Sequence, residues 1–345
     1  MARLSRSRGR VDITAVADHA QVSRQTVSNA LNAPHRLHPD TLTRVLGSIE
    51  ELGYRPNQAA RSLRTRSSRV IGCRLLSVGP AGVGGVTDRF MHSLCTAARR
   101  SRYDVLTFAV ADDQEEIDTF RDLIRRGAVD GFVLPGTHRD DPRADCLRNS
   151  PAAFVAFGRP WGAPEPAHSW VDVDGAAGVT SCVEHVFERG ARRIGFLGWP
   201  EGSGVGDDRH AGWQATCRRL GLPTQHLSLR GEDRIETGQA LADRLLDRAQ
   251  PVDALVCVSD LMAIGAIRAI EARGLVVGGD VAVTGFDDSP LASVVRPGLT
   301  SVRQPLEEAA ESIVAILTGH LTGRLTDPVT DLKTPTLVTR GSTTP

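Results

Sequence analysis

The sequence has little of several residue types on which specialised proteins depend. Its 345 residues include a single lysine, Lys333, two tyrosines and three methionines, and aromatic residues make up only 4%. No apolar run of about 18 residues occurs, which argues against a transmembrane helix and a membrane partner. The basic N-terminus has no apolar core of the kind that a signal peptide needs, so we expect a cytoplasmic protein.

Motifs for metal binding and catalysis are also missing. The six cysteines include no C-x-x-C pair, so we expect reduced thiols that serve mostly as small core residues. The histidines show no H-E-x-x-H spacing, and G-x-S-x-G is absent, so we predict no metal site and no enzyme. Residues 82–85 lack the third glycine of a dinucleotide loop, and no cofactor is expected. The acidic cluster at 112–116 begins a predicted helix, which favours a solvated face.

Charge is distributed unevenly along the chain. The whole sequence is neutral, but residues 1–69 contain 12 Arg and 5 acidic residues, so they carry 12 − 5 = +7. The remaining residues carry 29 − 36 = −7. A basic module joined to an acidic body indicates a nucleic-acid partner for the first part only.

The stretch 11–32 predicts two short helices joined by a tight turn. Ile13, Val16, Ala17 and Ala20 follow the spacing of one helix face, and Val27, Ala30 and Leu31 repeat it in the second helix. Between them, Ser23 is a good N-cap. The outward side of the second helix carries Arg, Gln, Thr, Ser and Asn, which pair with base edges and phosphates in a DNA major groove. An ordinary helical hairpin with a solvated face is the alternative.

A third helix is expected to complete this module. It would begin near Pro39, bury Leu42, Val45, Leu46, Ile49 and Leu52 against the first two helices, and end at Gly53. The following segment, QAARSLRTRSSR, predicts a short helix with Ala59, Ala60 and Leu63 on one side. A helix of two turns is marginal alone, so it would need a symmetry mate or DNA as a partner.

From Arg69 onward, short apolar strands alternate with segments of helical length. The expected strands are 70–76, 104–110, 131–136, 153–158, 193–199, 253–259 and 281–286, and the expected helices are 88–101, 115–126, 175–189, 208–220, 235–249, 260–273 and 305–318. Repeated βα units predict parallel sheets covered by helices, here as two lobes. A ligand would bind beyond the carboxyl ends of the strands, where Gly, Asp, Ser and Trp are frequent.

At this point the sequence resembles the LacI/GalR family of bacterial transcription regulators. The resemblance rests on V-x-I-x-x-V-A-x-x-A-x-V-S-x-x-T-V-S-x-x-L-N, on GYRPN, and on RHAGW, SDLMAIGAIRAIEARG and VAVTGFDDSPLA in the second half. It implies an all-α helix-turn-helix headpiece (1–56), a hinge helix and linker (57–68), and an α/β core (69–345) of two parallel-sheet lobes like type I periplasmic binding proteins. Lobe 1 would comprise about 69–171 and 304–332, and lobe 2 about 172–303 and 333–345.

The resemblance also implies DNA contacts. Arg24, Gln25 and Asn29 match positions that read bases, although many members have Arg at the position of Asn29. Phosphate-contacting positions match Ser23, Thr26, Ser28, Asn32 and Thr41, and the DNA-binding set further includes Tyr54, Asn57, Ala60 and Leu63. Leu63 would wedge into the minor groove of a palindromic operator bound by a homodimer. Asp12 stands where Thr is common, and its carboxylate would repel a phosphate.

The same resemblance implies an effector site between the lobes. Its residues match Arg209, Asp287, Ser259, Asp260, Gln304, Trp199 and Asp233. Gly158 replaces an Asp that many members have, so we expect that contact to be missing. Trp161, Trp170 and Trp199 are candidates to stack on sugar rings, with core packing as the alternative for each.

The sequence therefore predicts a repressor of carbohydrate-utilisation genes that a small sugar releases from operator DNA. The stretches 157–178 and 198–213 look most similar to actinobacterial members that sense cellobiose or related β-glucosides. The alternatives are a corepressor-type regulator with a non-sugar effector such as a purine, and a sugar-binding protein without a regulatory role.

Overall fold

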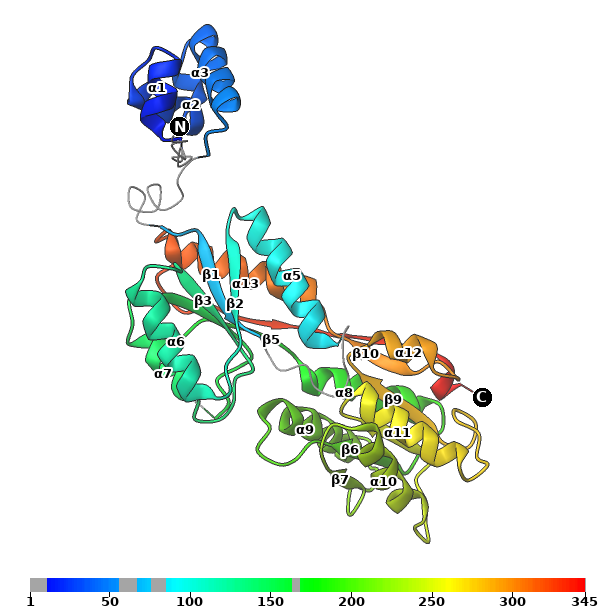
Figure 1. Cartoon of the computed structure of the whole chain (residues 1–345). Helices are drawn as coiled ribbons and strands as arrows, with labels where there is room; N and C mark the ends of the chain where they lie inside the picture. Colours follow the sequence, from blue (N-terminus) through cyan, green and yellow to red (C-terminus); the bar gives the residue numbers. More distant parts are fainter. Residues whose placement is uncertain (1–10, 56–66, 76–84, 163–167, 345) are drawn as a thin grey trace, which may run out of the picture. The chain divides into compact units, whose positions relative to one another are not determined.

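The chain folds into two compact units, Met1–Ser68 and Arg69–Pro345. The computed structural model describes residues 11–55, 67–75, 85–162 and 168–344 (Figure 1). The predicted hinge helix, with Asn57, Ala60 and Leu63, lies outside these residues. None of the helices described is long and apolar enough to cross a membrane.

The first unit contains a helix-turn-helix. Helix α1 spans Ile13–His19, α2 spans Arg24–Asn32, a 3-10 turn spans Pro34–Arg36, and α3 spans Pro39–Leu52. Ser23 caps α2 as predicted, because its Oγ accepts from the Thr26 backbone N–H at 3.1 Å. Asp12 caps α1 in the same way, with its Oδ1 2.9 Å from the Ala15 nitrogen. Gly53 ends α3 in the left-handed conformation at φ 62°.

The core of this headpiece follows most of the predicted apolar positions, although Leu31 is half-buried and lies outside the core cluster. Val16, Val27 and Val45 are fully buried, and Ala17, Ala20 and Ala30 surround them. The expectation that Leu46 is buried was wrong, since 45% of it is exposed. Ser48 is buried instead, where its hydroxyl lies 3.1 Å from His19 Nδ1 and donates to the Arg44 carbonyl. A hydrogen-bonded serine thus takes a place that apolar periodicity alone does not reveal.

Lobe 1 of the second unit is a parallel six-stranded sheet with helices on both faces (Figure 1). In order across the sheet, its strands are β11 (Thr330–Lys333), β5 (Trp170–Val173), β4 (Ala153–Phe157), β3 (Gly131–Pro135), β1 (Val70–Arg74) and β2 (Asp104–Phe108). Its helices are α5 (Val86–Arg100), α6 (Asp113–Arg125), α7 (Pro142–Arg148) and α13 (Leu306–Leu321). Two apolar clusters, one centred on Leu94 and Ile313 and one on Phe120 and Phe132, form its core.

Lobe 2 repeats this architecture. Its strands are β12 (Thr336–Val338), β10 (Thr300–Arg303), β9 (Ala282–Phe286), β8 (Ala254–Cys257), β6 (Ile194–Gly198) and β7 (Ser228–Arg230), all parallel except for the β10–β12 pair. Its helices are α8 (Gly175–Glu188), α9 (Gly204–Arg219), α10 (Ile235–Leu246), α11 (Asp260–Glu271) and α12 (Pro290–Val294), with a 3-10 turn at Gly341–Thr343. One large apolar cluster fills this lobe.

The chain passes between the two lobes three times. These crossings lie between β5 and α8, between β10 and α13, and between β11 and β12. Three short connections join the lobes. One region therefore contains the start of α9 and the carboxyl ends of β4, β6, β8 and β9. This arrangement positions the candidate effector site.

All seven strands and seven helices expected in the second unit are present, although α9 begins at Gly204 rather than near 208. The fold class is thereby confirmed. Four of the six cysteines are buried and none of the six forms a disulfide, as expected. Five short strands (β5, β7, β10, β11, β12) and two short helices (α7, α12) were not predicted.

Candidate nucleic-acid and effector sites

The exposed side of α2 carries the residues predicted to read DNA. Arg24 and Gln25 are exposed, and Asn29 is half-buried one turn later. The amide of Gln25 donates to Asn29 Oδ1 at 3.0 Å, which fixes two candidate base-reading amides as a pair. The hydroxyls of Ser23 and Thr26 lie 2.9 Å apart at the start of the helix. An N-terminal helix end that carries hydroxyls and an arginine suits a phosphate backbone and a base edge.

The other predicted DNA contacts are placed less uniformly. Asn32 is exposed, but its side chain donates to the Ser28 carbonyl at 2.8 Å, within its own helix. Thr41 is half-buried in the first turn of α3, and Tyr54 packs against the headpiece core. Tyr54 therefore has a structural contact that would hold its ring in place.

Arg209 lies at the centre of the candidate effector site. It belongs to α9 and is only 4% exposed. Its Nη1 donates to the Val258 carbonyl at 2.6 Å, and its guanidinium carbon lies 3.6 Å from the ring centre of Phe286 and 5.2 Å from that of Trp199. Its Nε finds no acceptor among the described residues. Burial lowers the pKa of Arg209, and nearby carboxylates oppose that shift.

Asp287, which follows β9, lies opposite Arg209. Its Oδ1 is 3.8 Å from Arg209 Nη2 and accepts from the amide of Gln304 at 2.7 Å. Burial raises the pKa of Asp287 to about 7, even though Arg209 favours the charged form. Its backbone has φ 109°, a conformation that aspartate seldom adopts, which sets the direction of this side chain. The structure therefore brings together three predicted effector residues, Arg209, Asp287 and Gln304.

Two further predicted residues, Ser259 and Asp260, lie at the start of α11, and a third, Asp233, lies just before α10. The hydroxyl of Ser259 donates to Asp233 and also caps α11 by accepting from the Met262 nitrogen. Asp260 is buried, and its two oxygens accept from Ser301 Oγ at 2.5 Å and from the Ser289 nitrogen at 2.7 Å. Both oxygens of Asp260 are thus occupied, so it acts as a positioning residue for the loop after β9. Burial raises its pKa to about 6.

A group of residues that was not assigned to the site lies beside Arg209. Arg159, which follows β4 in lobe 1, donates to Asp172 at 2.7 Å and, across the lobes, to Asp208 at 2.8 Å. Its guanidinium lies 4.6 Å from the ring centre of Trp161. One sequence feature could have indicated this group: Asp208 directly precedes Arg209 in a predicted helix. Adjacent helical residues point about 100° apart, so Asp208 can contact a different neighbour from Arg209.

Comparison with known proteins fits both units. Residues 12–57 match the family described as "Bacterial regulatory proteins, lacI family", and residues 183–343 match "Periplasmic binding protein-like domain". The chain is 33% identical to the HTH-type transcriptional regulator CelR of Thermobifida fusca over 90% of this chain and 93% of that protein.

The chain belongs to the LacI family of bacterial regulatory proteins.

Two solved structures of LacI-family proteins extend this result. The complex of the transcriptional regulator CelR with cellobiose is 30% identical, with a TM-score of 0.73 over 96% of this chain and all of that chain. The Lac repressor dimer bound to operator and the anti-inducer ONPF is 25% identical, with a TM-score of 0.83 over 98% of this chain and all of that chain. As a LacI-family member, the chain is a DNA-binding transcriptional regulator and not an enzyme.

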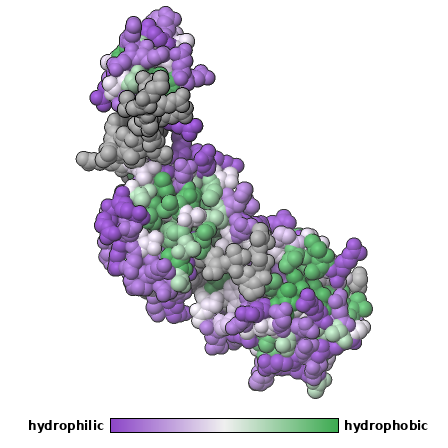
Figure 2. Space-filling view, viewed as in Figure 1, coloured by the Kyte–Doolittle hydropathy of each residue, from purple (hydrophilic) through white to green (hydrophobic). Residues whose placement is uncertain are grey.

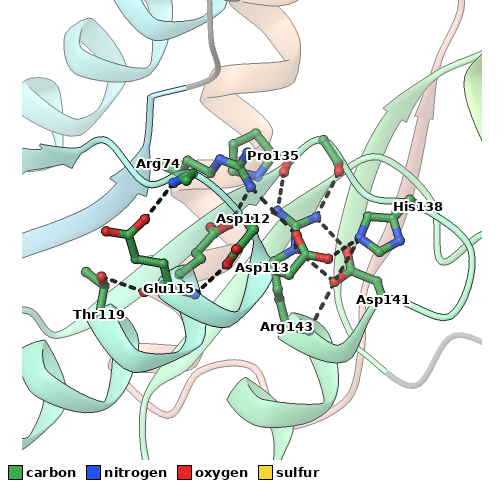
Figure 3. Close-up of polar contacts among 12 residues, drawn as sticks. Arg74, Asp112, Asp113, Glu115, Thr119, Pro135, His138, Asp141 and Arg143 are labelled. Atoms are coloured by element: carbon green, nitrogen blue, oxygen red, sulfur yellow. Dashed lines mark hydrogen bonds and ion pairs between the residues drawn. The ribbon is translucent and has the colours of Figure 1, made fainter.

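A second charged group lies at the carboxyl ends of β1 and β3 in lobe 1 (Figure 3). The predicted solvated face at 112–116 was wrong for Glu116, which is fully buried and accepts from both Arg74 and Arg143 at 2.9 Å. Asp113 lies 2.7 Å from His138 Nε2 (Figure 3). Asp112 caps α6, as the acidic helix start suggested. Because Arg74 and Arg143 pair with the carboxylates of this group, Asp113, Glu116 and Asp141, we interpret it as a structural ion-pair network rather than a cation site.

Proposed function

We propose that this LacI-family regulator is a repressor of carbohydrate-utilisation genes that a small sugar, such as cellobiose or another β-glucoside, releases from its operator. The observation that carries the proposal is the pair formed by buried Arg209 and half-buried Asp287, with Trp199 beside it and Arg209 Nε unpartnered. A guanidinium and a carboxylate side by side offer donors and acceptors to neighbouring sugar hydroxyls. An aromatic ring next to them suits the apolar face of a sugar ring.

The residue that directly follows β4, Gly158, differs from that of many relatives. Gly158 has φ 120°, and a side chain there would begin 2.2 Å from Thr137 Oγ1. Both the backbone and the space exclude the aspartate that other members carry. We infer that the lobe-1 contacts to the effector come from elsewhere in this chain.

For the DNA we assign residues 1–56 as the binding headpiece and 57–68 as the hinge and linker. Arg24, Gln25 and Asn29 would read bases, and the hydroxyls of Ser23 and Thr26 would bind phosphates. The pairing of Gln25 with Asn29 supports this, since it presents both amides on one exposed face. We infer that the protein acts in the cytoplasm at the nucleoid, where its operator lies.

We infer that the operator is bound by a homodimer. Figure 2 shows apolar surface over β1 and β2 of lobe 1 and around α12 of lobe 2. Exposed apolar side chains there include Leu106 on β2 and Val294 on α12, which are 38% and 72% exposed, together with Leu291. Apolar surface on two lobes of one unit suits a second copy of the chain.

A thermal-shift screen of the full chain tests the sugar proposal. Cellobiose, cellotriose, maltose and glucose would be compared at equal concentrations, with Arg209→Lys as the control variant. We expect one or more sugars to raise the melting temperature of the wild type and to have no effect on the variant, because lysine cannot form the two-pronged contact. Stabilisation by a purine and by none of the sugars would replace the proposal with the corepressor alternative.

A further inference from the structure

Three N–H groups around the start of α9 are buried without an acceptor. They are Nε1 of Trp161, Nε1 of Trp199 and Nε of Arg209, and the described residues offer none of them a partner. Unpaired buried donors are costly and uncommon, so three of them close together need a reason. A ligand that carries several acceptor oxygens would satisfy them, and Arg209 itself is 4% exposed.

Trp161 is the member of this set that comes from lobe 1. A Cβ added to Gly204, the first residue of α9, would lie 2.3 Å from Cγ and from Cδ2 of the Trp161 ring. Gly204 lies in a helical turn that any residue adopts, so its lack of a side chain is explained by the tryptophan and not by its backbone. The ring of Trp161 therefore rests on the backbone of lobe 2.

Arg159 holds this arrangement together. It lies against the Trp161 ring and donates to Asp208, which is one turn after Gly204 on the same face of α9. With Gly204 and Arg159 both packed on the ring, the edge that bears Nε1 is the part of Trp161 left for a ligand. Nε1 on that edge is buried in this structure, so a ligand would have to displace what covers it.

The spacing along α9 indicates the size of the ligand. Gly204, under Trp161, precedes Arg209 by five residues, which is about 7.5 Å along a helix. This is the separation of the two backbone positions along the helix axis, from which we infer that a sugar unit held by Arg209 and Asp287 leaves Trp161 to contact a second unit.

We propose that Trp161 is a specificity-determining residue of the effector site, whose indole N–H donates to the second sugar unit and so selects disaccharides over monosaccharides. The proposal rests on the sugar-responsive function proposed above. It assigns to lobe 1 the contact that Gly158 does not provide.

Isothermal titration of the full-length protein with cellobiose, maltose and glucose tests the proposal. Trp161→Phe keeps an aromatic ring and removes the N–H donor, so we expect roughly tenfold weaker binding of the preferred disaccharide, the value of one hydrogen bond. Binding of glucose should not change. Gly204→Ala should give the same selective loss, because the new methyl group displaces the ring without altering any donor.

Trp213→Phe is the matched control. Its Nε1 is also buried and unpartnered, but this tryptophan is 1% exposed in the core of lobe 2, so disaccharide affinity should stay at the wild-type value. Unchanged disaccharide affinity in Trp161→Phe, or an equal loss for glucose, overturns the role of Trp161 while the sugar function stands. If the wild type binds none of the sugars, both proposals fail.

Discussion

At the scale of single residues, the effector site depends on charges that the fold has partly taken out of water. Asp260 and Asp287 lie after the carboxyl ends of two strands, and burial raises the pKa of each toward neutrality. Asp260 accepts from protein donors through both oxygens, whereas Asp287 has Gln304 and Arg209 beside it and is the candidate to contact a ligand. The two adjacent strand ends thus carry one structural and one candidate binding carboxylate.

The raised pKa of Asp287 predicts a pH dependence of stability. Because the folded state binds the proton more tightly than the unfolded chain, this group stabilises the fold below its unfolded pKa of about 4, and the contribution is lost as the pH rises to about 7. Because asparagine does not titrate in this range, Asp287→Asn should lose less stability than the wild type as the pH rises. Melting temperatures of both proteins between pH 4 and pH 8 would show the wild type falling more steeply, and parallel curves would contradict the assignment.

Arg24 predicts a change in DNA specificity. If its guanidinium reads a guanine, Arg24→Ala should weaken the preferred operator by ~1–3 kcal/mol and relax the preference at one base pair. An operator would first be selected from random duplexes. Competition binding of the wild type and the variant to this operator and to its single-base-pair variants then measures the change in preference. A uniform loss on every sequence would mean that Arg24 contacts only phosphate.

At the scale of elements, the sequence predicts the long, strongly periodic segments and misses the short ones. Buried parallel strands such as β3 and β8 are apolar throughout, so they stand out in the sequence. β11 and β12 have three or four residues with mixed exposure and lie at sheet edges, where pairing with a distant strand decides the conformation. Arg209, Asp287 and Gln304, which the sequence motifs indicated, lie together in the structure. The contact between Trp161 and Gly204 joins positions 43 residues apart in sequence, so it could not be predicted without the fold.

Helix α1 carries a prediction of its own, because Asp12 serves two opposed purposes. Its carboxylate caps the helix, and the resemblance to the LacI family implies that it would also face a phosphate. Asp12→Asn keeps the cap and removes the charge, so it should tighten operator binding with little change in stability. Asp12→Ala should cost about 1 kcal/mol of helix stability, measured by hydrogen exchange of the α1 amides. Weaker operator binding by Asp12→Asn would show that the carboxylate does not face DNA.

At the scale of the whole molecule, regulation requires that the two units act through a dimer. The headpiece supplies the basic charge and the second unit supplies the candidate effector site and the exposed apolar surfaces. A sugar shifts the equilibrium only if it binds the DNA-incompetent state more tightly than the competent one. Its effect must therefore be visible in the affinity for DNA as well as in the affinity for the sugar.

The apolar surface around α12 predicts the assembly. Val294→Glu places a charge on a residue that is 72% exposed, so it should weaken dimerisation without unfolding the chain. Leu332→Glu is the control, since Leu332 is 42% exposed on β11, at the sheet edge opposite to β2. Analytical ultracentrifugation should show a shift of the equilibrium from dimer to monomer for Val294→Glu only. A dimer unaffected by Val294→Glu would place the interface elsewhere.

The most direct test of the account is the linkage between sugar and operator. The affinity of the full-length protein for a palindromic duplex selected in vitro would be measured by fluorescence anisotropy at increasing cellobiose concentration, and the affinity for cellobiose would be measured with and without that duplex. We predict that each ligand weakens the other by the same factor, as thermodynamic linkage requires. Operator affinity that stays constant with cellobiose and with every other sugar in the panel would contradict the account.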